Sequence, residues 1–150
     1  MTDRMAKAEM LIRQPPSNVF DAFVKPDILT RFWLEAASGP LAPGARVTWR
    51  FMVPGASESL TVTAFDPPQL IAFDWSDGLH VRLGFADHPP GATRVTAEVT
   101  GFATDARVAD IVDATEGFSI VLCDLKTLLE TGRSAHLVRD KAMLIAASPR

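Results

Sequence analysis

The sequence is poor in the features that identify several classes of protein. A single cysteine among 150 residues excludes an internal disulfide bond. The 15 basic and 18 acidic residues give a net charge of -3, without the basic excess expected of a nucleic-acid-binding protein. No apolar run approaches the roughly 20 residues of a transmembrane helix, and charges interrupt the N-terminal segment where a secretory signal would be apolar. We therefore expect a cytoplasmic protein with no membrane insertion.

Metal and phosphate motifs are missing as well. His80, His88 and His136 are scattered, with no spacing that would predict a zinc site. The glycines form no phosphate-binding pattern, so we expect neither a metal nor a cofactor. Cys123 stands at the flank of an apolar helical stripe without a histidine pattern beside it, which predicts a buried, unreactive thiol.

The length and composition suit one globular domain. Hydrophobic residues make up 47% of the chain and charged residues 22%, and no repeat or low-complexity linker divides it. We predict a single domain over 1–150, with its core at 5–132 and a C-terminal tail at 133–150. The tail could fray, pack on the outside of the domain or contact a partner.

The hydrophobic period changes three times along the chain: from two to helical, back to two, and to helical again near the C-terminus. After an alternating strand at 8–12, prolines divide the next apolar stripe into two short helices. Turn-separated alternating segments then predict an antiparallel meander with one dry face and one wet face. These segments lie at 47–51, 60–64, 71–75, 81–85 and 95–99. We predict an α+β fold with a curved antiparallel sheet of about six strands.

The last long segment has a helical period. It is expected to begin near Asp105 as N-cap and to end at Gly132, a length of ~27 residues or about 40 Å. Its acidic residues lie away from the centre of the apolar stripe: Asp110, Asp113, Glu116 and Asp124. The stripe itself consists of Val108, Ile111, Thr115, Phe118, Leu122, Leu125 and Leu129. Since such a stripe must be buried, we predict that the helix packs on the dry face of the sheet.

This order of elements resembles the START-like superfamily of helix-grip domains, also called SRPBCC. Three motifs are similar to the branch related to the activator of heat-shock protein 90 ATPase, and the resemblance covers roughly residues 5–132. They are a proline, aromatic and Pro-Asp pattern in 15–33, the segment FDPPQLIAFDW at 65–75, and EGFSIVLCDLKTLLETG at 116–132. Phe118 stands where the family has tryptophan. The resemblance implies binding of hydrophobic or aromatic small molecules, enzymatic activity such as that of cyclases or hydratases, or a role beside a chaperone in the stress response.

The inner face of the predicted sheet carries no ionisable residue. General acid–base chemistry needs a titratable group within reach of the substrate, so this face argues against catalysis and we name no catalytic residue. The residues expected on the dry face are Val47, Trp49, Phe51, Leu60, Val62, Ala64, Ile71, Phe73, Trp75, Val81, Leu83, Phe85, Val95, Ala97 and Val99.

A ligand cavity is expected between this face and the long helix. Thr115 and Ser119 could orient the polar end of a ligand, or each hydroxyl could bond to the carbonyl one turn earlier. The aromatic residues could line the cavity or fill the core. The predicted lining is Trp49, Phe51, Phe73, Trp75, Leu83, Phe85, Thr115, Phe118, Ser119 and Leu122.

Three functional hypotheses follow. The first is a noncatalytic domain that binds a hydrophobic or aromatic small molecule. The second is an interaction module, either a homodimer or a partner of a chaperone, suggested by the resemblance and by the apolar tail segment 142–145. The third is an enzyme acting on an aromatic substrate, which requires a titratable side chain inside the cavity.

Overall fold

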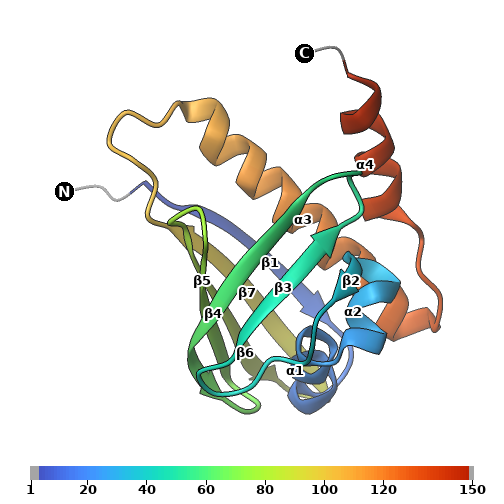
Figure 1. Ribbon diagram of the computed structural model, residues 1–150. Helices are drawn as coiled ribbons and strands as arrows, with labels where there is room; N and C mark the ends of the chain where they lie inside the picture. Colours follow the sequence, from blue (N-terminus) through green and yellow to red (C-terminus); the bar gives the residue numbers. More distant parts are fainter. Residues whose placement is uncertain (1–3, 149–150) are drawn as a thin grey trace.

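The computed structural model describes residues 4–148 and consists of a curved sheet around a long helix (Figure 1). Residues 1–3 and 149–150, which the predicted domain range 1–150 includes, lie outside the described residues. The elements are β1 (Ala6–Ile12), α1 (Pro16–Val24), α2 (Pro26–Phe32), β2 (Leu34–Ala37), β3 (Arg46–Phe51), β4 (Ser57–Asp66), β5 (Leu70–Trp75), β6 (His80–His88), β7 (Ala92–Thr100), α3 (Val108–Thr131) and α4 (Leu137–Ala147).

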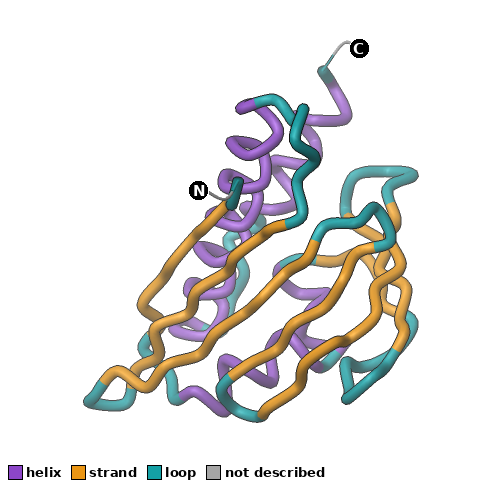
Figure 2. The backbone as a smooth tube through the Cα atoms, turned by 90° about the vertical axis from the view of Figure 1, so that its left-hand side faces the viewer, coloured by secondary structure: helices purple, strands orange, loops and turns teal. Residues whose placement is uncertain are grey.

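The described strands form one antiparallel sheet of seven strands in the order β1-β7-β6-β5-β4-β3-β2. The helices lie on its concave side (Figure 2). The predicted α+β helix-grip fold is therefore confirmed, with one strand more than the six expected. The additional strand, β2, pairs Leu34 with Phe51 of β3. Its four residues are too few to show a period of two in the sequence.

Prolines begin both short helices, as expected from the sequence. Pro16 and Pro26 occupy first-turn positions, where the missing N–H has no intrahelical partner to lose. The backbone of Lys25 is extended between the two helices, so that this residue ends α1 and precedes α2. The buried face of α1 includes Phe20 and Phe23, which both pack against Phe85 of β6.

The alternation of the strands is confirmed over most of the dry face, with one local reversal. The β4–β5 register shifts between Val62 and Ala64, so that Ala64 lies opposite Ala72 on the outer face. Phe65 then turns inward, opposite Ile71, and packs edge-to-face on a phenylalanine of α1. The expectation that Ala64 faces the core was wrong, because one extra residue in a strand inverts every later side chain.

α3 begins two residues later than the sequence suggested. Arg107 is the N-cap, and its backbone N–H donates to Asp110 Oδ2 at 2.9 Å in a capping box. Asp105 precedes the helix in an exposed loop. The predicted end was right, since Gly132 adopts φ +82°, a left-handed conformation that glycine takes without strain.

The C-terminal half of α3 is attached to β1 through Lys126 and Glu130. Lys126 Nζ donates to Leu11 O and to Glu130 Oε2, both at 2.7 Å, and the Arg13 N–H donates to the same carboxylate at 2.7 Å. Burial by itself raises the pKa of Glu130, but these hydrogen bonds and the nearby positive charges outweigh it and hold the pKa below its ordinary value. The helix is thereby fixed to the edge strand of the sheet.

The rest of α3 differs from the sequence expectation at two residues. Cys123 is exposed, not buried, because it lies on the side of the helix that the sheet does not cover. Asp124, which we expected away from the apolar stripe, is 1% exposed. It is covered by the chain that follows Gly132, where the predicted tail turns back and forms α4.

No helix in residues 4–148 combines the length and apolar composition that a bilayer crossing requires. Within the same range, no group of three His, Cys, Asp or Glu side chains is arranged to hold a metal ion.

Candidate functional site

An apolar pocket of about 320 Å³ lies between α3, α4 and the β3–β4 end of the sheet. This volume falls at the lower end of the range of small-molecule sites. The lining comes from the end of α2, the β3–β4 turn, the end of β5 and one face of each of α3 and α4. It consists of Trp33, Phe51, Met52, Val53, Ala56, Trp75, Ala114, Gly117, Phe118, Ile120, Val121, Val138, Lys141, Ala142 and Ile145.

The floor of the pocket is a set of aromatic rings in edge-to-face contact. Trp33 packs against Trp49 with ring centres 4.9 Å apart and against Phe118 at 5.5 Å. Trp75 lies 5.5 Å from Trp49 and 5.7 Å from Phe51. Such packing holds large side chains in fixed orientations, so the floor is rigid and presents apolar carbon to the pocket.

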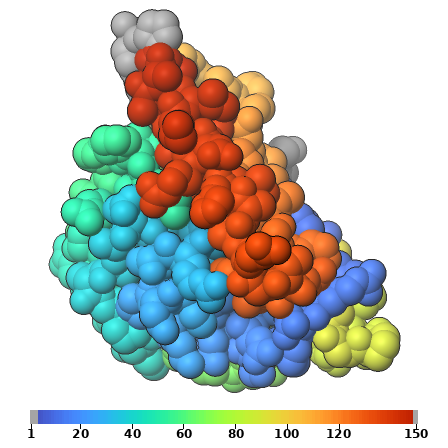
Figure 3. All heavy atoms as spheres, turned by 90° about the vertical axis from the view of Figure 1, so that its right-hand side faces the viewer, coloured from blue at the N-terminus to red at the C-terminus, as the bar shows by residue number. Residues whose placement is uncertain are grey.

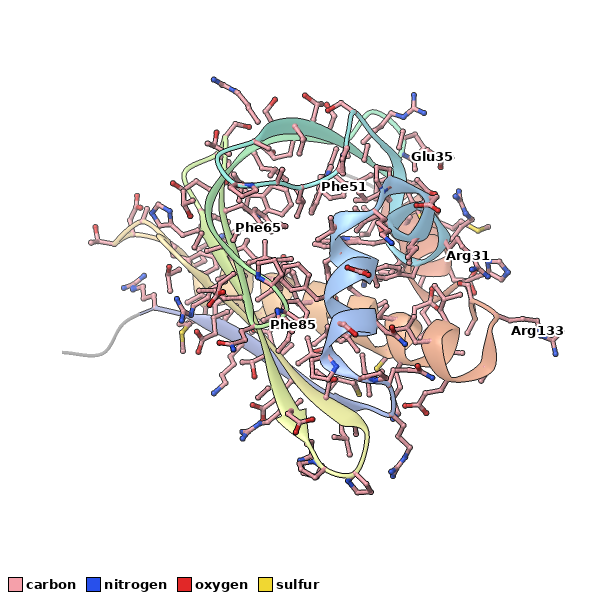
Figure 4. The ribbon with its side chains drawn as sticks, turned by 90° about the horizontal axis from the view of Figure 1, so that it is seen from below. Arg31, Glu35, Phe51, Phe65, Phe85 and Arg133 are labelled. Carbon is pink, nitrogen blue, oxygen red and sulfur yellow. The ribbon has the colours of Figure 1, made fainter. Side chains whose placement is uncertain are left out.

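The predicted lining residues divide into two groups. Phe51, Trp75 and Phe118 border the pocket. Figure 4 shows Phe51, Phe65 and Phe85 on the inside of the curved sheet, where Phe85 packs against the phenylalanines of α1. Of the predicted residues that do not border the pocket, the five apolar ones are buried in the core, each less than 5% exposed: Trp49, Phe73, Leu83, Phe85 and Leu122.

The two hydroxyls on α3 bond within their own helix. Thr115 Oγ1 donates to Ile111 O at 2.8 Å, and Ser119 Oγ donates to Thr115 O at 2.8 Å. Neither residue borders the pocket. Of the two interpretations left open by the sequence, the structure shows the back-bonded one.

Trp49 carries a buried donor that no sequence pattern indicated. Its indole Nε1 has no hydrogen-bond acceptor among the described residues. The ring is enclosed by Trp33, Phe73 and Trp75. A buried N–H without an acceptor costs about 1–3 kcal/mol, which the packing of these rings must offset.

α4 forms the outer wall of the pocket. Val138, Ala142 and Ile145 face it, and the helix crosses the upper part of the face shown in Figure 3. Two ion pairs support this position: Arg139 Nη2 to Glu35 Oε1 of β2 at 3.1 Å, and Lys141 Nζ to Glu116 Oε1 of α3 at 3.1 Å. α4 was not among the elements predicted for the site, although the spacing at 138, 141–142 and 145 is that of one helix face.

Asp124 fixes the turn that leads into α4. Its Oδ2 accepts from Ser134 Oγ at 2.7 Å and its Oδ1 accepts from the Ala135 N–H at 2.8 Å. Ser134 Oγ in turn accepts from the His136 N–H at 2.9 Å, so the carboxylate organises three residues before the helix. One buried acid thus sets the direction of the pocket's outer wall.

A polar recess of about 430 Å³ lies beside this turn, but its charged groups are engaged in the structure. Arg31 Nη2 donates to Gly132 O at 3.1 Å, and Arg139 pairs with Glu35. Arg133 extends away from the molecule (Figure 4). These contacts connect α2, β2 and α4 and give the recess a structural role.

The family described as Activator of Hsp90 ATPase homolog 1-like protein matches residues 13–130. No curated protein matches the chain. Among solved structures, the protein SSP2350 from Staphylococcus saprophyticus is similar, with a TM-score of 0.78 and 28% identity over 87% of this chain and 94% of that one.

Two further structures share the fold at lower identity. The Aha1 dimer from Colwellia psychrerythraea has a TM-score of 0.77 and 18% identity, covering 89% of this chain and 100% of that one. DynU16, from the dynemicin biosynthetic locus, has a TM-score of 0.78 and 19% identity over 89% of this chain, which spans about half (49%) of DynU16.

Proposed function

Because the chain belongs to the family of Activator of Hsp90 ATPase homolog 1-like proteins, we propose that it binds a hydrophobic small molecule in the pocket beneath α4. One observation carries the proposal: the described residues leave an apolar space of about 320 Å³ between α3, α4 and the β3–β4 end of the sheet. Transferring an apolar molecule from water into such a space is favourable. The rigid aromatic floor would pre-organise the site and so reduce the cost of binding.

The pocket supports binding better than catalysis. Acid–base chemistry needs a titratable group positioned at the reacting atoms. Lys141 is the one ionisable residue among the described residues that border the pocket. A single ammonium group at the edge of an apolar space suits the recognition of a ligand, and we include no reaction in the proposal.

A fluorescence titration tests the proposal directly. The chain has three tryptophans and no tyrosine, and Trp33 and Trp75 border the pocket. A neutral naphthylamine dye bound there should quench tryptophan emission by energy transfer, saturably and at one site per chain.

A matched pair of variants locates the bound dye. A side chain placed at Gly117 starts in open space, since nothing lies within 4 Å of an added Cβ, and Gly117→Phe should fill the pocket. Val112→Phe adds a similar ring to the same helix at a residue that is 56% exposed. We expect Gly117→Phe to weaken binding by at least about tenfold and Val112→Phe to leave it unchanged. Equal affinities of both variants and the unmodified protein would rule out this pocket.

Self-association is the second candidate, favoured by the outer face of α4. Met143 and Leu144 are each 65% exposed there, on the side away from the pocket. An Aha1-like neighbour is described as a dimer. Removing residues after Gly132 and measuring mass by light scattering tests this idea, and a monomer both before and after removal would count against it. A chaperone partner, which the family description suggests, would be detected by adding that chaperone in the same experiment.

A further inference from the structure

We infer that the ligand of this pocket is an amphipathic carboxylate whose charged end pairs with Lys141. The inference rests on the proposed binding function and adds the chemical class of the ligand. It follows from where the one charge of the pocket lies, how weakly that charge is held, and how little else in the lining can satisfy a polar group.

Lys141 belongs to the pocket face of α4, one turn from Val138 and one turn from Ile145. Its Nζ is 3.1 Å from Glu116 Oε1, and Glu116 does not border the pocket, which places the ammonium group at the pocket's edge. A lysine so placed can keep its aliphatic stem against apolar surface while its charge stays in water. A ligand lying in the pocket would therefore meet carbon along its length and a positive charge at one end.

The present partner of Lys141 is easily replaced. The Lys141 side chain is 36% exposed and that of Glu116 is 51% exposed, so the pair is well solvated. An exposed pair of this kind stabilises a protein little. If a ligand carboxylate takes the place of Glu116, the displaced side chain returns to water, and the new pair lies against an apolar surface where solvent screens it less.

The remaining lining restricts the rest of the ligand. Apart from the backbone and Lys141, the described lining offers the indole N–H groups of Trp33 and Trp75 and the sulfur of Met52. A polar group buried without a partner costs free energy, so polarity should be confined to the Lys141 end. At about 30 Å³ for each water-sized unit, 320 Å³ holds roughly ten non-hydrogen atoms. Decanoate, which has an apolar chain and one terminal charge, is a suitable probe.

Two ligands of equal chain length, one charged and one neutral, isolate the effect of the ligand's charge on its affinity. Decanoate and 1-decanol, both at monomeric concentrations and pH 7.5, are titrated into the protein while tryptophan emission and heat are recorded. We expect decanoate to bind about tenfold more tightly than decanol, as for one charge-assisted hydrogen bond. In Lys141→Met the preference should disappear while the affinity for decanol stays within about twofold, because the apolar stem is retained.

Three further variants complete the test. Lys141→Arg keeps the charge and should keep the preference, whereas Glu116→Gln removes the competing carboxylate and should increase it. Lys25→Met, at an exposed lysine paired with Asp21 on α1, should change neither affinity. Thermal unfolding confirms that each variant folds.

The outcomes separate the two proposals. Equal binding of both ligands, or a preference for decanoate that survives in Lys141→Met, would overturn the inference and leave the binding function standing. If neither decanoate nor decanol binds, and the neutral dye does not bind either, both proposals fail. If the dye binds and neither decyl ligand does, the carboxylate class is refuted and the pocket remains a binding site.

Discussion

Asp124 offers the most direct way to separate the outer wall of the pocket from the rest of the fold. It is 1% exposed and accepts hydrogen bonds from Ser134 Oγ and the Ala135 N–H. Replacing it by alanine removes both acceptors without changing the apolar face of α3. We therefore expect Asp124→Ala to detach α4 locally while the sheet and α3 stay folded.

The magnitude follows from the two hydrogen bonds. Each bond to a charged group contributes roughly 1.5–3 kcal/mol when its loss leaves the donor unpaired. Both donors belong to a surface turn, where water can replace the carboxylate, so we take about half the sum, roughly 1.5–3 kcal/mol. This corresponds to about a 13- to 150-fold increase in the population in which α4 is open. Asp124→Asn keeps one acceptor oxygen and should show an intermediate effect.

Hydrogen exchange measures this opening residue by residue. Amides of α4 (Leu137–Ala147) should exchange faster by the stated factor, while those of β6 and β7 should change little. Affinity for the neutral dye should fall in parallel, because α4 supplies one wall of the pocket. Asp113→Ala, at an exposed aspartate of the same helix, is the control and should change neither quantity.

A uniform increase in exchange across the whole domain would refute the reasoning. It would mean that Asp124 stabilises the global fold and not the attachment of α4. Unchanged exchange in α4 would equally refute it, because the turn would then be held by contacts other than this carboxylate.

Two further predictions concern the stability of the scaffold. Glu130→Gln should lower the free energy of unfolding by about 1 kcal/mol at pH 7, a value reduced for solvent screening at this surface site. The pKa of Glu130 is lower in the folded state than in the unfolded state. The stability that Glu130 contributes is therefore complete above its unfolded-state pKa of ~4.3, and it is lost as the pH falls through its folded-state pKa. Urea denaturation should therefore show the difference at pH 7 and little difference at pH 2; a constant difference would contradict the assignment. Gly101→Ala should cost more than Gly55→Ala: both glycines have positive φ (+89° and +81°), but only at Gly101 would a Cβ lie 2.8 Å from a backbone oxygen. We expect about 1 kcal/mol for Gly55→Ala and roughly 1–3 kcal/mol more for Gly101→Ala, and equal losses would show that the loop adjusts.

Much of the fold could be read from the sequence because each long element buries one face. Alternation at 71–75 and 81–85 correctly identified which side chains face the core. Gly132 correctly marked the end of α3. These patterns are local, and a local pattern is enough to state which side of an element is apolar.

The exceptions have local causes that a single period does not reveal. The bulge before Phe65 inserts one residue into β4, and the resulting change of face depends on the pairing with β5. β2 is four residues long, too short to show alternation. The late start of α3 depends on a capping box between Arg107 and Asp110, where the sequence offered Asp105 as a stronger N-cap residue.

The site depended much more on tertiary structure. Three of the predicted lining residues border the pocket and five are core residues, because burial by a ligand and burial by a neighbouring side chain leave the same apolar pattern. The other two, Thr115 and Ser119, bond within α3. The outer wall comes from α4, whose place is set by a hydrogen-bonded turn around Asp124.

The sequence alone therefore determined the kinds of element, their order and the apolar face of the sheet, since these depend on periodicity along the chain. Only the tertiary structure decided where the packed surfaces diverge enough to leave a pocket, and that Lys141 carries its one charge. The reason is geometric: periodicity reports which way a side chain faces, whereas a pocket depends on the distance to whatever lies opposite.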